Sequence, residues 1–308
     1  MTFSLTILGS SSALPTSNRT VTAHVLNVHE RFFLIDCGEG TQMQLRRYRI
    51  PFSKIHNIFI SHLHGDHFYG LFGLLSSLNL IGRKIPLHIY EPPDLKKFLD
   101  LHFGDSAVQL NYPLIFIPHR MKGKSFVMED NYIYVESFPL DHKIESVGFL
   151  FREKEGELRI RKEAISDLNL GIREIVALKQ GSDYVNEMGK LYPNSELTIP
   201  PHHPRSYAYC SDTRYTETLI PIIKNVDLLY HEATYLDEMK ARAIITGHST
   251  AREAAVIAGK ANVRKLIIGH FSSRYKNVNP LVEEARSIFP ETYSAEEGLC
   301  FKVDQLTD

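Results

Sequence analysis

Cysteine is scarce in this chain, and the three that occur stand far apart. Cys37, Cys210 and Cys300 are odd in number and have no CxxC spacing. They therefore form neither a disulfide framework nor a cysteine-based metal site, the two common uses of several cysteines. A chain that does not depend on disulfides suits a reducing compartment, so we expect a cytoplasmic location.

The sequence also lacks a strong net charge and a long apolar run. Its 35 basic and 36 acidic residues give a formal net charge of −1, which argues against a histone-like binder but leaves a local basic patch open. No stretch approaches the roughly 18 consecutive apolar residues of a membrane span. The N-terminus has no basic region before its apolar residues, so we expect no signal peptide. With 43% hydrophobic residues among 308, we expect a soluble globular protein without membrane association.

Short apolar or β-branched runs alternate with segments of helical periodicity. Strand-like runs precede helix-like ones at 57–62 and 71–82, and again at 87–92 and 93–104. This alternation predicts an α/β fold with mixed sheets. The segment 152–205 differs, because it is rich in charge, glycine and proline and poor in apolar residues. We expect it to be an insertion or arm with a small helical part.

Three histidines and one aspartate stand within six positions, in the run HLHGDH between two apolar stretches. The residues are His62, His64, Asp66 and His67. They follow a predicted strand and precede a predicted helix, and loops at the carboxyl ends of strands are where α/β folds build their sites. Imidazole and carboxylate groups are the ligands of catalytic zinc, with manganese or iron possible. The run therefore predicts a metal centre.

Three more candidates stand in the same strand-to-loop position later in the chain, namely His142, Asp212 and His270. The predicted scheme has two ions that share Asp212, because a bridging carboxylate offsets the repulsion between close cations. The first ion is held by His62, His64, His142 and Asp212. The second is held by Asp66, His67, His270 and Asp212. A hydroxide held between the ions would have its pKa lowered toward neutrality, which would make it a nucleophile at physiological pH.

The motifs around these residues resemble those of the metallo-β-lactamase superfamily and, within it, the ribonuclease Z family of tRNA 3′-processing endoribonucleases. The resemblance runs in order along nearly the whole chain, through LIDCGEGTQMQ, IFISHLHGDHFYGLFGLL, FPLDHKIESVGF, YCSDTRY, LLYHEATY, GHSTAREAA and IIGHFSSRY. HxHxDH alone specifies only the superfamily, whereas GEGTQ, HEATY and HFSSRY are narrower. The resemblance implies a four-layered αβ/βα sandwich formed by 1–308 as a single domain, with a substrate-binding arm inserted at about 152–205.

The resemblance also implies an activity and roles for three residues. The family uses zinc, here two ions per subunit with manganese possible, and usually works as a homodimer. It cleaves precursor tRNA after the discriminator base and leaves a 3′-hydroxyl. Asp66 would then accept a proton beside the hydroxide. His248, at the start of a predicted helix, would contact the scissile phosphate or protonate the leaving group, and Glu232 would orient His248. Asp36 is expected to brace the HLHGDH loop.

Five polar residues of these motifs, and one of the early loop LGSSSALPTSNRTVT that also resembles the family, are expected to contact the substrate. Arginine suits phosphate because its planar guanidinium bonds two oxygens at once, and serine hydroxyls can also bond phosphate oxygens. The expected contacts are Arg19, Thr41, Gln42, Ser272, Arg274 and Tyr275. The arm departs from the family pattern, because its return limb LTIPPHHPRSYAY has prolines but no Gly-Pro step. The way in which this arm would contact tRNA therefore does not follow from the family pattern.

Two other functions are compatible with these residues. A hydrolase of small esters or sulfates would use the same fold and metals, since one scaffold hosts many reactions, but a small substrate needs no arm. A non-enzymatic RNA- or metal-binding protein with a decayed site would have lost some ligands, whereas all seven candidates are present. We therefore expect a metal-dependent endoribonuclease.

Overall fold

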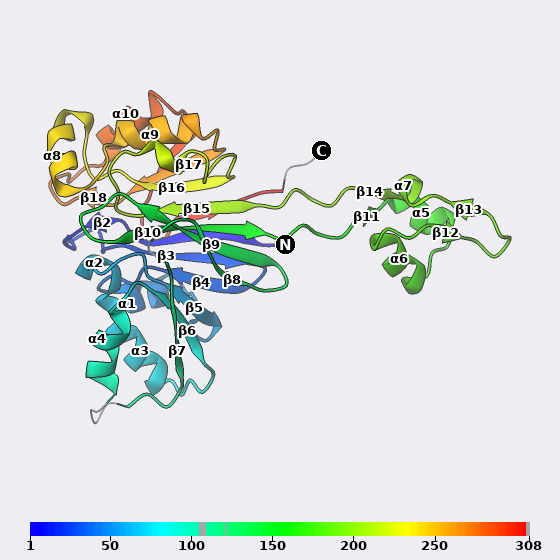
Figure 1. Ribbon diagram of the computed structural model, residues 1–308, viewed down its shortest axis with the longest axis horizontal. Helices are drawn as coiled ribbons and strands as arrows, with labels where there is room; N and C mark the ends of the chain where they lie inside the picture. The colour runs from blue at the N-terminus through cyan, green and yellow to red at the C-terminus, as the bar shows by residue number, and fades with distance from the viewer. Residues whose placement is uncertain (105–108, 121, 306–308) are drawn as a thin grey trace. The chain divides into compact units, whose positions relative to one another are not determined.

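Two seven-stranded sheets organise the computed structural model, which describes residues 1–104, 109–120 and 122–305. Figure 1 shows the two sheets stacked on each other in one unit of the chain, with a core of residues from both between them. The first sheet has the order β20 (Cys300–Lys302), β1 (Phe3–Gly9), β3 (Ala23–Val28), β4 (Arg31–Ile35), β5 (Ile55–Phe59), β6 (Leu87–Glu91) and β7 (Leu114–Pro118). The second has the order β19 (Thr292–Ser294), β17 (Lys265–Gly269), β16 (Leu228–Glu232), β15 (Ser206–Cys210), β10 (Ser146–Glu153), β9 (Ile133–Leu140) and β8 (Ser125–Glu129).

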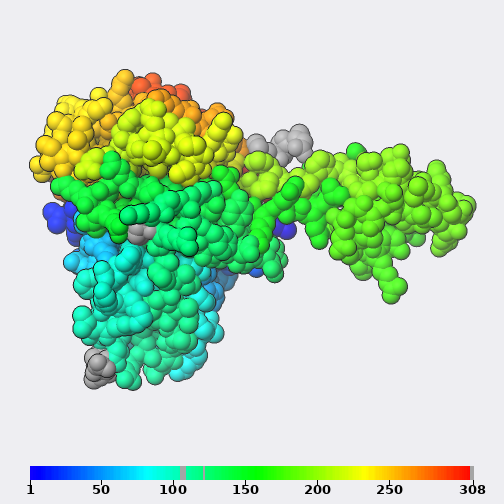
Figure 2. Space-filling model, in the orientation of Figure 1, coloured from blue at the N-terminus to red at the C-terminus, as the bar shows by residue number. Residues whose placement is uncertain are grey.

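Helices cover the outer face of each sheet. The first sheet packs its apolar side chains against α1 (Thr41–Arg47), α3 (Gly70–Leu80) and α4 (Leu95–Phe103). The second packs against α9 (Ala251–Lys260) and α10 (Asn279–Arg286). Helix α8 (Lys240–Thr246) precedes α9 in the chain. In Figure 2 the C-terminal helices, yellow to orange, form one side of this unit, and the cyan helices form the opposite side. The layers are therefore helix, sheet, sheet and helix, which confirms the predicted α/β fold with mixed sheets.

Aromatic side chains fill the space between the two sheets. Phe59 of β5 is fully buried and stacks on Tyr90 of β6 at a ring-centroid distance of 4.4 Å. It also meets Phe149 and Phe151 of β10, edge to face, at 5.3 and 5.2 Å. Such pairs add to the hydrophobic stabilisation of burying the rings. These aromatic contacts hold β5 and β6 of the first sheet against β10 of the second.

Parallel pairing brings the carboxyl ends of several strands to one edge. In the first sheet β4, β5, β6 and β7 pair in parallel. In the second sheet β15, β16, β17 and β19 do the same. The loops that follow these strands include short elements: α2 (Gly65–Phe68), and β2 (Ser11–Ser12) paired with β18 (Phe271–Ser272). Three 3₁₀ turns lie at Phe52–Lys54, Glu217–Leu219 and Asp237–Met239.

The segment Glu153–Pro204 forms a second compact unit. Its elements are β11 (Arg159–Ile160), α5 (Lys162–Asp167), α6 (Ile172–Lys179), β12 (Tyr184–Val185), β13 (Leu191–Tyr192), α7 (Asn194–Leu197) and β14 (Thr198–Ile199). β11 pairs with β14, and β12 with β13. A small core of Ala164, Leu170, Leu178 and Leu197 holds the unit together. The segment lies at the predicted insertion, and its role as an arm stays a prediction.

Within the described ranges, no helix combines the length and the apolar character needed to cross a membrane.

Truncating the aromatic contact between the sheets should destabilise the fold. We expect Phe59→Ala to lower the free energy of unfolding by about 3–5 kcal/mol, because it removes a large buried ring and leaves a cavity. Denaturant unfolding followed by circular dichroism measures the change. Phe98→Ala is the control, since the Phe98 ring is 47% exposed, and it should cost less than about 1 kcal/mol. Equal losses for the two variants would contradict this account of the core.

Candidate metal centre

The predicted ligands meet at the edge where the parallel strands end. His62 follows β5, Asp212 follows β15, and His270 follows β17. The HLHGDH loop is fixed against the GEGTQ loop by backbone bonds, from Cys37 N to His67 O at 2.7 Å and from Gly70 N to Cys37 O at 2.9 Å. The approach is so close that a Cβ atom on Gly70 would lie 2.0 Å from the carbonyl oxygen of Gly38. Both motifs therefore belong to one local structure.

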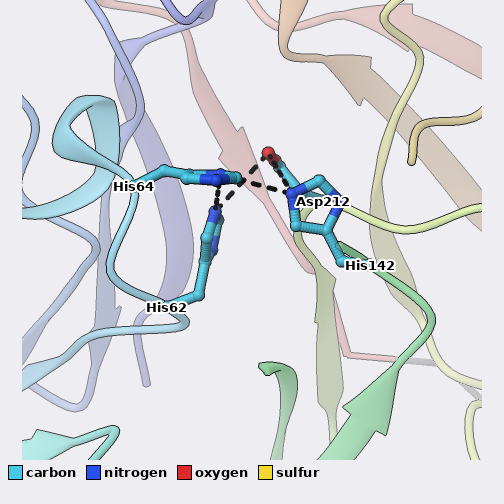
Figure 3. Close-up of side chains that lie close together, drawn as sticks. All are labelled: His62, His64, His142 and Asp212. Atoms are coloured by element: carbon cyan, nitrogen blue, oxygen red, sulfur yellow. Dashed lines mark hydrogen bonds and ion pairs between the residues drawn. The ribbon is translucent and has the colours of Figure 1, made fainter. Parts of the chain in front are cut away.

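Three imidazoles and one carboxylate converge in the first cluster, which Figure 3 shows. Nδ1 of His64 lies 3.1 Å from Nε2 of His62 and 3.2 Å from Nε2 of His142. Oδ2 of Asp212 lies 3.5 Å from His62 Nε2 and 3.7 Å from His142 Nε2. Ligand atoms about 2.0–2.1 Å from a tetrahedral zinc lie roughly 3.3 Å from one another. The spacing of the four donors therefore suits one such ion.

The second cluster uses the other oxygen of Asp212. His67 Nε2 and His270 Nε2 lie 3.4 and 3.2 Å from Asp212 Oδ1. The same two nitrogens lie 3.5 and 3.3 Å from Oδ2 of Asp66. Asp212 thus presents one oxygen to each cluster, as a bridging ligand must. The structure brings together all seven predicted ligands, and their binding of metal stays a prediction.

The charges of this region suit cations. Asp212 and Glu232 are buried, and the side chain of Asp66 is 8% exposed. Among the described residues no lysine or arginine forms an ion pair with any of the three, and their ion-pair partners are histidines. Among the described residues, the buried atoms His67 Nε2 and Asp212 Oδ1 have no hydrogen-bond partner, although they lie 3.4 Å from each other. A buried charge costs free energy unless an opposite charge pairs with it or it coordinates a metal ion. These buried atoms without hydrogen bonds therefore support a fit to metal ions, independently of the sequence motif.

Hydrogen bonds hold the ligand rings with one nitrogen toward the clusters. The Nδ1–H of His142 donates to the carbonyl of Gly247 at 2.6 Å. Thr234 gives its hydroxyl proton to Glu232 and so accepts from the Nδ1–H of His270 at 3.0 Å. Nε2 of each ring is then left without a proton when the ring is neutral. Burial and the neighbouring His67 lower the pKa of His62 to about 4, which likewise keeps that ring neutral.

His248 and Glu232 form the predicted pair. The Nδ1–H of His248 donates to Glu232 Oε1 at 2.9 Å, and Asp212 Oδ2 lies 3.9 Å from the same nitrogen. Glu232 is fully buried and also accepts bonds from the backbone N–H groups of Thr213 and Ser249. Burial opposes protonation of His248, but the Glu232 carboxylate outweighs it and raises the pKa of His248 to about 9. Glu232 therefore orients this imidazole.

A cavity of about 500 Å³ opens beside both clusters and includes His64, Asp66, Asp212, His248 and His270 in its lining. Sequence reasoning missed its other lining residues, which include Leu14, Pro15, Glu39 and Tyr69. The Tyr69 ring is 61% exposed. Glu39 and Tyr69 stand inside the motifs GEGTQ and HLHGDHFYG. Their position in sequence beside the predicted ligands was the only feature that could have indicated that they line the site. The phenol ring of Tyr69 is not a usual zinc ligand, and the Glu39 carboxylate stands outside the HLHGDH run.

None of the six expected substrate contacts lines this cavity. Arg19 donates through its guanidinium to the backbone carbonyls of Ser272 and Tyr275 at 3.4 and 2.9 Å. Thr41 is buried and donates to Gly38 O, and Gln42 accepts from the Ser77 hydroxyl. These bonds explain structural roles for the three side chains. Substrate contact by any of them stays a prediction.

The remaining members of that set, Ser272, Arg274 and Tyr275, belong to the HFSSRY loop. The hydroxyl of Tyr275 accepts from the backbone N–H of Leu236 at 3.1 Å. Arg274 is exposed, donates to the Ser272 hydroxyl at 3.2 Å and lies over the Tyr235 ring. Of the two arginines expected to contact the substrate, Arg274 is therefore the more exposed to solvent.

Comparison with known proteins gives full-length likenesses. Ribonuclease Z of Bacteroides thetaiotaomicron is 43% identical to this chain, over 99% of this chain and 97% of that protein. Ribonuclease Z of Cytophaga hutchinsonii is 46% identical, over 98% and 97%. A family model described as anti-Pycsar protein Apyc1 matches residues 3–146, a range that includes HLHGDH and His142 but neither Asp212 nor His270.

Solved structures are similar to the whole chain. The short form of human tRNase Z has a TM-score of 0.71 and 26% sequence identity, covering 98% of this chain and 99% of that one. A metallo-β-lactamase fold protein of Bacillus subtilis has a TM-score of 0.68 and 16% identity, covering 98% and 100%. These likenesses confirm the predicted metallo-β-lactamase fold.

Replacing the shared carboxylate should weaken both clusters at once. We expect Asp212→Asn to lower zinc affinity by more than about tenfold, because even the loss of an outer hydrogen-bond partner of a ligand costs about 10–100-fold. Competition with a chromogenic chelator measures the affinity. The control is Asp227→Asn, since Asp227 is also buried but bonds Ser206 and Arg264 away from the site. Wild-type zinc affinity in Asp212→Asn would exclude the bridging assignment.

Proposed function

This chain belongs to the ribonuclease Z family, and we propose that it is an endoribonuclease that removes the 3′ trailer from precursor tRNA and leaves a tRNA 3′-hydroxyl. The observation that carries the proposal is the convergence of seven side chains of metal-ligand type at one edge of a fold shared over its full length with this family. The motif-based assignment to the family is thereby confirmed. Metal dependence follows from the family and from the His/Asp groups present.

Two zinc ions per subunit are the proposed cofactor, with manganese as the alternative. His62, His64, His142 and Asp212 would hold one ion, and Asp66, His67, His270 and Asp212 the other, as the spacing of their donor atoms supports. When bound, such ions offset the charge on phosphoryl oxygens and acidify water. A homodimer in the cytoplasm, expected from the family likeness, completes the proposal.

The chain's own residues would handle the protons of the reaction. Water attacks the phosphorus and loses a proton to Asp66, whose Oδ2 is oriented by the backbone N–H of Ala13 at 2.7 Å. The bond from phosphorus to the 3′-oxygen of the tRNA breaks, and that oxygen takes a proton from His248. Because Glu232 holds Nδ1 of His248, the imidazole offers Nε2 to the leaving oxygen. The 5′-phosphate stays on the trailer.

The missed cavity residues suit a nucleotide beside the scissile phosphate. Tyr69 exposes 61% of its surface, and Leu14 exposes 62%, both on the cavity lining. Bases of single-stranded RNA bind proteins by stacking on aromatic rings. A Tyr69 ring at this place would support a base that flanks the cleaved bond.

Cleavage of precursor tRNA tests the proposed function directly. We expect the zinc-loaded protein to cut a 3′-extended precursor after the discriminator base, and Asp66→Ala and His248→Ala each to lower kcat by about 10²–10⁴-fold, the usual contribution of a general acid or base. End-mapping of the products measures this. His56→Ala, an exposed histidine outside the site, should stay within twofold of wild type. Absent RNA cleavage, with rapid hydrolysis of a phenyl ester or sulfate, would favour the rival hydrolase.

We also propose that the unit Glu153–Pro204 contacts the tRNA. It has its own core but contains seven lysines and arginines against nine aspartates and glutamates, so any phosphate contact depends on arrangement and not on excess charge. Arg152 of β10 pairs with Ser206 of β15 in antiparallel register. A short glycine-rich turn can therefore replace the unit without breaking the sheet.

Replacing that unit by such a turn should separate binding from chemistry. We expect KM for precursor tRNA to rise at least about tenfold, the effect of losing roughly 1.4 kcal/mol of binding. Hydrolysis of a small phosphodiester, which needs no arm, should stay within twofold. Unchanged KM for tRNA would contradict the proposed role of the unit, and lost activity on both substrates would show that the replacement damages the metal centre.

A further inference from the structure

A tyrosine outside both metal clusters is bonded to the residue that supports them. Tyr209 lies on β15, fully buried between the two sheets. Its hydroxyl donates to Oδ2 of Asp36 at 2.6 Å. Burial and the Asp36 carboxylate raise the pKa of Tyr209 well above its ordinary value, so the hydroxyl keeps the proton that it donates.

Asp36 accepts four hydrogen bonds, three at Oδ2 and one at Oδ1. Besides Tyr209, the donors are the Nδ1–H of His67 at 2.8 Å and both the backbone N–H and the hydroxyl of Ser61, at 2.7 and 2.8 Å. Asp36 also has a φ of 54°, a left-handed conformation that persists only where the surroundings enforce it. The carboxylate is therefore held in one orientation by its partners.

The four bonds determine which ring nitrogen faces the metal site in two histidines. His67 gives its Nδ1–H to Asp36, so Nε2 of a neutral ring carries the free lone pair. Ser61 has a single hydroxyl proton, and Asp36 takes it. The Ser61 oxygen must then accept from the Nδ1–H of His62, 2.9 Å away. Nε2 of a neutral His62 therefore carries no proton either, and it lies 3.5 Å from Oδ2 of Asp212.

We propose that Tyr209 is a positioning residue that fixes Asp36 and, through it, orients His62 and His67 for metal binding. The inference rests on the proposed function in that these two rings are taken as ligands, one in each cluster. Loss of one hydroxyl, about 2.6 Å from a carboxylate, thereby weakens both ion sites. Outer hydrogen-bond partners of metal ligands commonly contribute 10–100-fold in affinity or activity.

The neighbouring Tyr230 provides a matched control. It is also fully buried, lies on β16, and stacks on Tyr209 with ring centroids 5.1 Å apart. Its hydroxyl has no hydrogen-bond partner among the described residues. Tyr209→Phe and Tyr230→Phe therefore make the same chemical change in the same aromatic layer, and only Tyr209→Phe removes a bond to Asp36.

The test compares zinc binding and catalysis in the full-length wild type and these two variants. We expect Tyr209→Phe to raise the zinc Kd about 10–100-fold, measured by competition with a chromogenic chelator, and to release zinc from both sites. Its kcat on precursor tRNA should fall at limiting zinc and recover in excess zinc, with KM for tRNA unchanged. Tyr230→Phe should match wild type within twofold in Kd and kcat.

Ser61→Ala extends the test if Tyr209→Phe does not fold. It removes the hydroxyl that links Asp36 to His62 and keeps the backbone bond, so it should raise the zinc Kd in the same direction. Wild-type zinc affinity in a folded Tyr209→Phe, or in Ser61→Ala, would overturn the proposal. A wild-type protein that binds zinc but does not cleave precursor tRNA would overturn the proposed function and leave the zinc comparison valid.

Discussion

The constraint on which the site depends is negative charge at the edge of the sheets that, in the described structure, is paired with histidines and with no lysine or arginine. Asp36, Asp66, Asp212 and Glu232 lie together at one edge of the two sheets, all nearly excluded from water. A charge in such surroundings is costly unless it is paired or coordinated. Histidines surround these carboxylates in the described structure. Cations between the imidazoles would complete the balance, and the chemistry of phosphodiester cleavage would follow from their placement.

The fold supplies the convergence that a single motif cannot. HLHGDH predicted a metal centre because its ligands are local in sequence, and the strand ends before His142, Asp212 and His270 predicted where the remaining ligands would come from. The side chains that hold these rings could not be predicted in the same way. Tyr209 bonds Asp36 across the two facing sheets, and Gly247 bonds His142 from a position 105 residues away in the chain.

The same limit explains the uncertain substrate contacts. Arg19, Thr41 and Gln42 stand in motifs of the family, and their side chains bond the backbone or helix α3 of this chain. A motif reports that a residue matters, and only the packed structure distinguishes a loop brace from a ligand contact. Tyr69 shows the converse, because an exposed ring on the cavity carries no pattern in the sequence that separates it from a core aromatic.

The central claim is that two ions share Asp212 at the edge of the sheets. Anomalous X-ray scattering from crystals of the zinc-loaded protein, recorded on both sides of the zinc absorption edge, tests it most directly. The account predicts two anomalous peaks flanking Asp212, one beside His62, His64 and His142 and one beside Asp66, His67 and His270. A single peak, or zinc bound away from Asp212, would contradict it.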